Sequence, residues 1–406
     1  MPSKSTFMIV GASLAGAKAA AALRDEGFDG RVLLLGEEPD RPYERPPLSK
    51  GYLRRESTFD DAAVHDGAFY DEQEIELRTS TPVALVDPKA SEVELGSGER
   101  LGYDRLLLAT GATPRMLPVP GAELDGVLYL RTRHDADVLH DVITSGSPLV
   151  VIGAGWIGAE VSASARQLGA DVTMVDVASV PLERVLGSEI GSIYRDLHEE
   201  HGVHLRLGAG VDALEGDGSV EAVRLSDGSV LPAGAVVVGV GVRPRTELAE
   251  AAGIEVDDGV VTDEHLATSV PGVFAAGDVA SAFHPAYGRR IRLEHWSAAL
   301  NQGPVAAANM LGRPTPYTKV PYFFSDQYDL GMEYRGWAPD ADQVIVRGDR
   351  AGRQFLAFWL RQGKVCAVMN ANVWDQGEAI DALLGKAVDG GELADPSSDL
   401  GQMAEG

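Results

Sequence analysis

The most informative stretch of this chain lies at residues 149–158 and reads Leu149-Val150-Val151-Ile152-Gly153-Ala154-Gly155-Trp156-Ile157-Gly158. The four apolar residues predict a strand buried on both faces, and the G-x-G-x-x-G that follows is typical of a turn leading into a helix. Glycine in this turn lets backbone N–H groups and the helix dipole hold a pyrophosphate. Asp176 ends the next apolar strand, where a carboxylate binds the ribose 2′-hydroxyl. The stretch therefore predicts a dinucleotide site.

The acid at the end of the second strand also bears on the choice of dinucleotide. A carboxylate at position 176 repels the 2′-phosphate of NADPH, and the first basic residue after it is Arg184. The sequence therefore favours NADH. The expected cofactor-binding residues here are Gly153, Gly155, Ile157, Gly158, Asp176 and Arg184.

A second, less regular turn of the same kind lies near the start of the chain. It reads Gly11-Ala12-Ser13-Leu14-Ala15-Gly16, with serine in place of the second glycine, between apolar runs at 7–10 and 32–35. Glu37 follows the second run, again where an acid would bind a ribose. An ordinary strand-to-helix turn is the alternative for such a degenerate motif. Taken with the strand, helix and acid, the turn predicts a second nucleotide site.

Composition limits what such a protein can do. The chain has 406 residues, which corresponds to two to four domains, and a net charge of −26, which disfavours nucleic acid and anionic membranes as partners. No apolar run approaches the ~18 residues of a membrane span. Cys366 is the single cysteine, so a disulfide or dithiol centre within the chain is excluded, and we expect a cytoplasmic protein. The nine histidines lack metal-ligand spacing, so no metal is expected.

The sequence pattern changes in the last part of the chain. Short apolar strands at 106–108, 236–238 and 273–275 continue the α/β pattern, and a proline-rich linker covers 309–321. Beyond it, strand-like segments at 343–347 and 354–360 predict a separate α+β domain. Residues 393–406 contain acids, serine and glycine but no lysine or arginine, which predicts a disordered tail. The expected fold class is α/β with two Rossmann-like domains of the glutathione-reductase type and a C-terminal α+β domain.

Two dinucleotide sites in one chain point to hydride transfer between a bound flavin, FAD, and a diffusing nicotinamide, NADH. Several further motifs agree, and together they resemble the FAD-dependent, NADH-linked ferredoxin reductases that serve Rieske dioxygenases and bacterial cytochromes P450, of the putidaredoxin reductase and biphenyl-dioxygenase reductase type. These motifs are Arg45-Pro46-Pro47-Leu48-Ser49-Lys50, Leu108-Ala109-Thr110-Gly111, Thr262 followed by Phe274-Ala275-Ala276-Gly277-Asp278-Val279, and Glu294-His295-Trp296. The resemblance runs in order from about residue 7 to 385.

The resemblance implies a domain plan. FAD would be bound by residues 1–112 and 245–316, NADH by 113–244, and residues 317–392 would form the C-terminal domain, followed by the tail at 393–406. It also implies contacts to each cofactor. For FAD these are Gly11, Ser13, Leu14, Ala15, Gly16, Glu37, Arg45, Pro46, Lys50, Val83, Ala109, Thr110, Gly111, Arg115, Arg131, Gly277, Asp278, Glu294, His295 and Trp296; Gly241 would back the nicotinamide.

Two residues are candidates for a catalytic role. A cation near flavin N5 stabilises the negative charge that develops as the flavin is reduced, and Lys50 is the best candidate for it. Glu160 follows Gly158 in the first turn of the expected helix and points toward the same place in this architecture. We therefore predict a Lys50–Glu160 pair beside N5. A solvated lysine and a helix-surface acid are the alternative.

The expected acceptor lies outside the chain. Related disulfide reductases keep a cysteine pair beside the flavin, whereas this chain has Pro46-Pro47-Leu48-Ser49 there. Electrons would leave to a ferredoxin-type iron–sulfur protein, docked by the basic cluster Arg289, Arg290 and Arg292; a merely solvated loop is the alternative. An NADH oxidase or quinone reductase, and a flavoprotein like apoptosis-inducing factor, are the alternative functions. The oligomeric state stays open.

Overall fold

The computed structural model describes residues 5–405, which form two compact units. Unit 1 comprises the residues up to 45, 58–113 and 242–321. Unit 2 comprises residues 46–57, 114–241 and those from 322 onward. The segment that carries Lys50 thus belongs to unit 2, together with the expected NADH and C-terminal domains.

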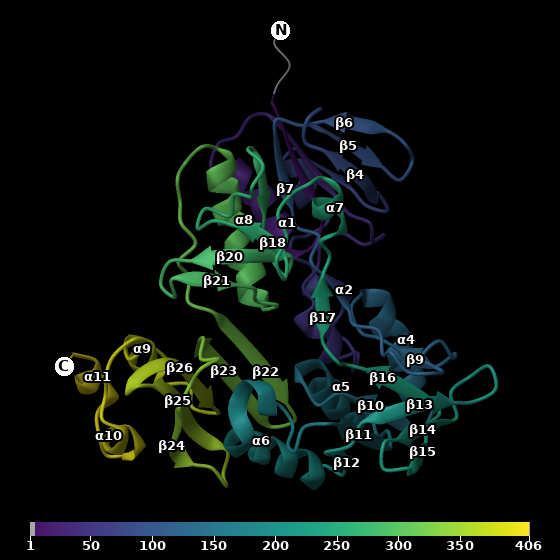
Figure 1. The fold of residues 1–406 in the computed structure, drawn as a ribbon, viewed down its shortest axis with the longest axis vertical. Coiled ribbons are helices and arrows are strands. Elements are labelled where there is room, and N and C mark those ends of the chain that lie inside the picture. The colour runs from purple at the N-terminus through teal and green to yellow at the C-terminus, as the bar shows by residue number, and fades with distance from the viewer. Residues whose placement is uncertain (1–4, 406) are drawn as a thin grey trace. The chain divides into compact units, whose positions relative to one another are not determined.

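Unit 1 is built on a parallel sheet whose strands run in the order β19-β7-β1-β2-β3. Of these strands, β7 is labelled in Figure 1. Their bounds are β1 Thr6–Val10, β2 Arg31–Leu35, β3 Ile75–Arg78, β7 Arg105–Leu108 and β19 Val273–Ala275. Phe7 and Ile9 belong to one apolar core, and Met8 and Val10 to another. Side chains alternate along a strand, so both faces of this sheet are buried, as the apolar runs predict.

Different elements pack against the two faces of that sheet. Helices α1 (Leu14–Asp25) and α8 (Trp296–Met310) share the core of one face. An antiparallel sheet of β4 (Val83–Asp87), β5 (Glu92–Leu95) and β6 (Arg100–Gly102) covers the other. The two helices approach so closely that a Cβ at Gly303 would lie 2.4 Å from the carbonyl oxygen of Ala15. The alanine-rich sequence of α1 permits this approach.

Unit 2 repeats the same plan. Its parallel sheet has the order β12-β11-β10-β16-β9, with β9 Val127–Leu128, β10 Leu149–Ile152, β11 Val172–Asp176, β12 His204–Leu207 and β16 Ala235–Val238. A second antiparallel sheet, of β13 Val211–Glu215, β14 Ala222–Leu225 and β15 Val230–Pro232, shares an apolar core with β10 and β16. Helices α4 (Arg133–Thr144), α5 (Trp156–Gln167) and α6 (Glu183–Glu200) complete this part. The expected pair of Rossmann-like domains is confirmed.

The C-terminal part of unit 2 is an antiparallel sheet in the order β22-β23-β26-β25-β24. Its strands are β22 Tyr322–Gln327, β23 Leu330–Gly336, β24 Gln343–Asp349, β25 Gln354–Arg361 and β26 Lys364–Ala371. One face packs on the apolar side of α6, and the other on α9 (Gly377–Ala382), α10 (Gly390–Ala394) and α11 (Leu400–Glu405). This confirms the expected α+β domain.

The prediction of a disordered tail at 393–406 is wrong for the part that the structure describes. Leu393 and Leu400 are buried in the core beneath the sheet. Arg347, on β24, donates hydrogen bonds to the carbonyl groups of Asp395 and Ser398, both at 2.6 Å. The segment has no basic residue of its own, but β24 supplies one and two leucines anchor it.

The remaining elements of the described chain are short. They are η1 Pro46–Ser49, α2 Phe59–Ala62, α3 Phe69–Glu72, β8 Ala112–Pro114, β17 Val242–Pro244, α7 Glu247–Ala251, β18 Val260–Thr262, β20 Ala280–His284 and β21 Arg289–Ile291.

Candidate functional site

The first glycine turn lies at the carboxyl ends of β1 and β7 in unit 1. A Cβ added to Gly11, whose φ is +118°, would lie 2.0 Å from the carbonyl oxygen of Ala109. A Cβ at Gly16 would lie 2.0 Å from the carbonyl oxygen of Gly11. Both positions therefore require glycine, and the loops after the two strands touch. The connections diverge here, since β2 and β7 flank β1 on opposite sides, which is where open α/β sheets bind dinucleotides.

The amino terminus of α1 fits a pyrophosphate. Ser13 is the N-cap residue, and its side chain makes no capping hydrogen bond to the helix. Leu14, Ala15 and Gly16 form the first turn, whose backbone N–H groups have no partner within the helix. Ser13 has an extended backbone, with φ of −122° and ψ of −161°, which any residue adopts. Serine in place of the second glycine therefore leaves this cradle intact.

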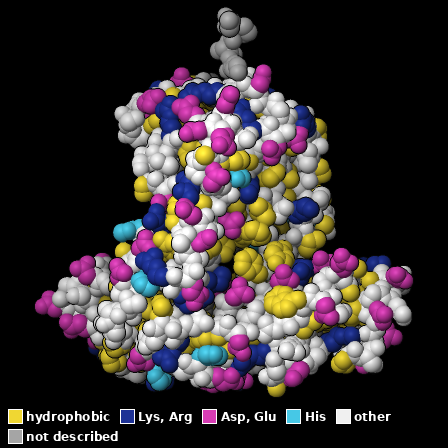
Figure 2. All heavy atoms as spheres, turned by 180° about the vertical axis from the view of Figure 1, so that it is seen from behind, with side chains coloured by type: hydrophobic (Ala, Val, Ile, Leu, Met, Phe, Trp, Pro, Cys, Tyr) yellow, Lys and Arg dark blue, Asp and Glu magenta, His cyan; other side chains and the backbone are white. Residues whose placement is uncertain are grey.

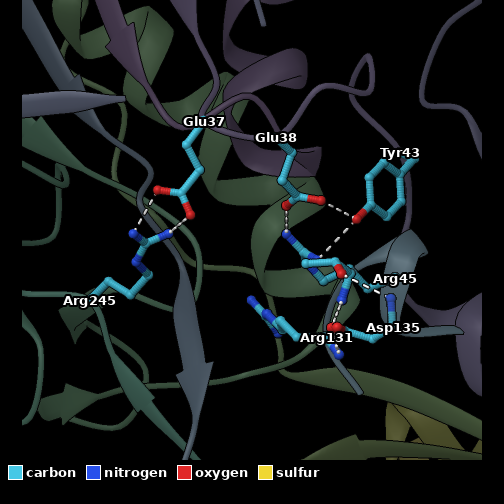
Figure 3. Close-up of polar contacts among 8 residues, drawn as sticks. Glu37, Glu38, Tyr43, Arg45, Arg131, Asp135 and Arg245 are labelled. Atoms are coloured by element: carbon cyan, nitrogen blue, oxygen red, sulfur yellow. Dashed lines mark hydrogen bonds and ion pairs between the residues drawn. The ribbon is translucent and has the colours of Figure 1, made fainter. Parts of the chain in front are cut away.

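Glu37 has a partner that the sequence did not reveal. Arg245 donates to both carboxylate oxygens of Glu37, each at 2.7 Å (Figure 3). This hydrogen bonding lowers the pKa of Glu37, which keeps the carboxylate charged. Each oxygen retains a lone pair for a ribose hydroxyl. No sequence pattern points to Arg245, because 208 positions separate it from Glu37.

Arg245 also ties Glu37 to the loop after β7. The Thr110 hydroxyl donates to the Arg245 carbonyl at 2.8 Å, and the Arg245 N–H donates to the Gly111 carbonyl at 2.9 Å. Val83, expected near the adenosine, begins β4, two residues after Thr81, whose N–H donates to the Gly36 carbonyl at 2.7 Å. The structure thus gathers Glu37, Thr110, Gly111 and the start of β4 beside the first glycine turn.

Arg45 pairs with neighbours on its own loop. It donates to Glu38 at 2.8 Å and to the Tyr43 hydroxyl at 3.3 Å, while Tyr43 donates to the other Glu38 oxygen (Figure 3). Asp278 also acts on Arg45 electrostatically. The guanidinium is therefore fixed in direction by residues that the sequence did not single out.

The segments around Asp278 and Trp296 meet in unit 1. The Gly277 N–H donates to Gln302 Oε1 of α8 at 2.8 Å, which fixes the loop after β19. His295 is the N-cap residue of α8, directly before Trp296. Burial lowers the pKa of His295 to about 4, although the Asp278 carboxylate acts in the opposite direction. His295 is therefore neutral at pH 7.

The second glycine turn, in unit 2, has the same geometry. A Cβ at Gly153, whose φ is +103°, would lie 2.4 Å from the Gly239 carbonyl oxygen in the loop after β16. A Cβ at Gly158 would lie 1.8 Å from the carbonyl oxygen of Gly153. Around Gly155, by contrast, no heavy atom lies within 4 Å of the Cβ position, and this residue begins α5 without a side-chain cap. The middle glycine therefore faces open space where a pyrophosphate fits.

Asp176 is held at the edge of this second turn. Its two oxygens accept hydrogen bonds from the backbone N–H groups of Ala154, at 2.6 Å, and Ala178, at 2.7 Å. The backbone thus fixes a negative charge where the ribose is expected. Ala154 also accepts from the Leu182 N–H at 2.9 Å, which brings the start of α6, with exposed Arg184, to the same edge.

The other expected contacts in unit 2 occupy varied places. Ile157 and Gly241 are exposed, and the Gly241 carbonyl accepts from the N–H of exposed Arg115 at 2.9 Å. The Arg131 N–H donates to the Asp135 carboxylate at 3.0 Å at the start of α4. Pro46 begins the turn η1, in which the Lys50 N–H donates to the Pro47 carbonyl at 3.0 Å.

Lys50 and Glu160 form a buried ion pair, as the sequence predicts. Lys50 Nζ lies 2.9 Å from Glu160 Oε2, and only 12% and 5% of the two side chains are exposed. Two hydroxyl groups that the sequence did not indicate complete the carboxylate: Ser49 donates to Oε2 at 2.5 Å, and Ser325 on β22 donates to Oε1 at 2.7 Å. Lys50 Nζ also lies 5.4 Å from the centre of the Phe324 ring. The position of the pair relative to the flavin stays a prediction.

The basic cluster expected at the docking surface divides in two. Arg289 and Arg290 are exposed on β21. Arg292 is not a rim cation: its side chain is 10% exposed and pairs with Glu294 and with Asp258, the latter at 3.2 Å. The expectation for Arg292 is therefore wrong, because its guanidinium is nearly buried and pairs with two carboxylates, one on the adjacent Glu294 and one on the distant Asp258.

No helix within residues 5–405 combines the length and apolar character needed to cross a membrane. No three His, Cys, Asp or Glu side chains within that range gather as a possible metal site.

Comparison with known proteins agrees with this geometry. The sequence model of the pyridine nucleotide-disulphide oxidoreductase family matches residues 5–303, and a reductase C-terminal model matches 322–404. Rhodocoxin reductase of Rhodococcus erythropolis is 41% identical over 90% of this chain and 86% of its own length. The ferredoxin–NAD(+) reductase component of the anthranilate 1,2-dioxygenase system of Burkholderia cepacia is 38% identical over 97% of this chain and 98% of its own.

A solved structure extends the comparison to the whole fold. The covalent putidaredoxin reductase–putidaredoxin complex matches with a TM-score of 0.95 and 36% identity, covering 99% of each chain. The family matches imply FAD and NADH, and the two glycine turns fit these groups. The chain therefore belongs to the pyridine nucleotide-disulphide oxidoreductase family and, within it, to the FAD- and NADH-dependent ferredoxin reductases.

Proposed function

We propose that this chain takes hydride from NADH onto FAD and passes single electrons to a ferredoxin-type iron–sulfur protein that feeds a cytochrome P450 or a Rieske oxygenase. The observation that carries the proposal is the pair of glycine turns, each at the carboxyl ends of a parallel sheet, in one chain. The relative from Burkholderia cepacia is named as the ferredoxin–NAD(+) reductase component of a dioxygenase system, and the relative from Rhodococcus erythropolis as a rhodocoxin reductase. We place the reaction in the cytoplasm, since the lone cysteine suits a reducing compartment.

The absence of a second cysteine supports an external acceptor. Cys366 lies on β26, and burial raises the pKa of its thiol, so it is not a reactive thiolate at neutral pH. A dithiol relay within the chain is therefore impossible. Electrons must leave to another molecule.

In this proposal, different residues of the chain bind FAD, bind NADH and assist hydride transfer. When bound, FAD supplies a centre that accepts two electrons as hydride and gives them up singly. The cradle at Gly11 and Gly16, with the ionised Glu37, would hold FAD, and the turn at Gly153–Gly158 would hold NADH. Lys50 would supply positive charge in a water-poor setting as negative charge develops during hydride transfer.

The fixed carboxylate of Asp176 should set the preference for NADH. We expect Asp176→Ala to narrow the ratio of kcat/KM for NADH over NADPH about tenfold, equal to about 1.4 kcal/mol. The change removes a charge that repels the 2′-phosphate and frees the N–H groups of Ala154 and Ala178 to bind it. Steady-state assays with both cofactors measure the ratio. A wild-type preference for NADPH would show that Asp176 does not select NADH.

The docking surface is proposed at Arg289 and Arg290, which lie on β21 close in sequence to His295 and Trp296. Acidic side chains are scattered among basic ones on the face seen in Figure 2 instead of gathering in one region. A net charge of −26 does not forbid an acidic partner, because association depends on the local field.

Replacing both exposed arginines should slow docking and spare chemistry. We expect Arg289→Ala/Arg290→Ala to weaken association with the ferredoxin by about 0.2–1 kcal/mol per charge at low salt, mostly through a slower association rate. The difference from wild type should shrink as salt rises. Turnover with ferricyanide should be unchanged, since this small acceptor needs no docking. Arg105→Ala/Arg206→Ala removes the same charge from exposed sites elsewhere and serves as the control. If ferredoxin-dependent turnover falls equally in both double variants, Arg289 and Arg290 have no specific docking role.

An acceptor assay tests the proposed function and separates it from the alternatives. NADH oxidation is followed with oxygen, a quinone, cytochrome c alone, and cytochrome c together with a ferredoxin recovered from the native extract on the immobilised protein. The proposal expects cytochrome c reduction to depend on the ferredoxin. Fast turnover with oxygen or quinone alone would instead indicate an oxidase or quinone reductase. A long-lived complex of reduced protein with NAD and slow turnover would indicate the redox-controlled type.

A further inference from the structure

A chain of buried hydrogen bonds ends on the Glu160 carboxylate. Ser325 donates to Glu160 Oε1 at 2.7 Å, and Gln327 Nε2 donates to Ser325 Oγ at 3.2 Å. The Gln327 oxygen lies 3.0 Å from His198 Nε2, and the Tyr328 hydroxyl lies 3.4 Å from His198 Nδ1. All but Tyr328 are nearly inaccessible: Glu160 is 4% exposed, and the three residues between them at most 1%. The chain links α5, β22 and α6 within unit 2.

All the hydrogen bonds in this series are donated in the same direction, toward Glu160. With its amide group donating to Ser325, Gln327 presents its oxygen to His198, so His198 must carry its proton on Nε2 and can accept only at Nδ1. Burial lowers the pKa of His198 to about 4, so the ring stays neutral and this arrangement persists at assay pH. Every bond from Tyr328 onward therefore points its positive end toward Glu160. Aligned hydrogen bonds of this kind polarise one another.

The amide group of Gln327 determines whether this series of hydrogen bonds can carry protons. A carboxamide does not relay protons as a hydroxyl or imidazole does, so the chain is not a proton path to His198. Its effect is geometric: it holds Glu160 Oε1 away from Lys50 and leaves Oε2 for Lys50 and Ser49. Without this support, Oε1 would lose its hydrogen bond inside the protein, and the carboxylate would be free to turn away from Lys50.

We propose that Ser325 is a positioning residue for hydride transfer, which, with Gln327 and His198 behind it, keeps the Glu160 carboxylate directed at Lys50. This inference rests on the proposed function, in which Lys50 assists reduction of the flavin. Other titratable groups act on Glu160 as well: Lys50 from the 46–57 segment, Asp326 from β22 and Tyr194 from α6. None of these is altered by a change at Ser325.

The test compares Ser325→Ala with Ser325→Thr and Ser162→Ala. Ser325→Thr keeps a hydroxyl that can donate to Glu160. Ser162 is two positions after Glu160 on α5, fully buried, and its hydroxyl has no hydrogen-bond partner within residues 5–405, so Ser162→Ala is a matched loss of a buried oxygen. The first measurement observes the hydrogen bond itself. Infrared difference spectra of the holoenzyme follow the carboxylate band that Glu160→Gln abolishes.

We expect Ser325→Ala to shift the frequency of that band, since a hydrogen bond to a charged group is lost. Ser325→Thr should restore the frequency, and Ser162→Ala should leave it unchanged. In anaerobic stopped-flow, flavin reduction by NADH should slow about tenfold in Ser325→Ala with NADH affinity preserved, and Ser325→Thr should recover the rate.

Two failures are distinguishable. If wild type is not reduced by NADH, the proposed function fails, while the infrared band of Glu160 still reports on Ser325. If wild type is reduced and Ser325→Ala matches it in both band frequency and reduction rate, or if Ser162→Ala shifts the band equally, Ser325 has no positioning role.

Discussion

Lys50→Met should slow reduction of the flavin by NADH about 100-fold, the largest effect expected from a single side chain. The ammonium group is nearly buried and is held by Glu160 at 2.9 Å, so its charge acts in a setting where water screens it little. NADH affinity should change far less, because the cradle that we propose for NADH is formed by residues 153–158 and does not include Lys50. Anaerobic stopped-flow at several NADH concentrations separates the two quantities.

Lys50→Arg is the control for that experiment. It keeps the charge and changes the shape, so it should recover part of the rate. Because removal of Lys50 leaves Glu160 buried without its ion pair, thermal stability should be compared for both variants. A reduction rate equal to wild type in Lys50→Met would place Lys50 away from the reacting atoms.

Gly158→Ala should abolish efficient use of NADH while FAD stays bound. Its new Cβ would lie 1.8 Å from the Gly153 carbonyl oxygen, which is backbone and cannot yield without moving the turn. We expect NADH to bind about 100-fold more weakly, or about 2.7 kcal/mol, and a lower Tm. Flavin absorbance and isothermal titration with NADH measure the two consequences separately.

Gly155→Ala is the matched change in the same turn. Its Cβ would meet nothing within 4 Å, so the Tm should equal that of wild type. The methyl group enters the space that the pyrophosphate needs, so NADH should still bind more weakly. If Gly155→Ala binds NADH as wild type does, the pyrophosphate lies elsewhere.

The sequence predicted the parts of the site that local pattern encodes. Glycine spacing and apolar runs identify both turns because close backbone contact at Gly11 and Gly153 allows no side chain there. The Lys50–Glu160 pair was predictable since each residue belongs to a motif. Ser325 was not, because it reaches Glu160 from 165 positions away along the chain.

Partners distant in sequence contribute to the other differences. Arg292 looked like one of three equivalent cations, yet it pairs with the distant Asp258 as well as with nearby Glu294. The last residues looked disordered because their own composition offers little core, yet Leu393, Leu400 and the distant Arg347 order them. Composition describes a segment alone, whereas its order depends on what the rest of the fold presents to it.

The most direct test of the central claim is an anaerobic electron count. The purified protein is mixed with one equivalent of NADH and then with the ferredoxin recovered from the native extract, while flavin and iron–sulfur absorbance are followed. The account predicts that one NADH bleaches one flavin per chain and that two one-electron ferredoxins are then reduced as the flavin colour returns. Bleaching by NADH without return of the colour on addition of ferredoxin, with return only on admission of oxygen, would contradict it.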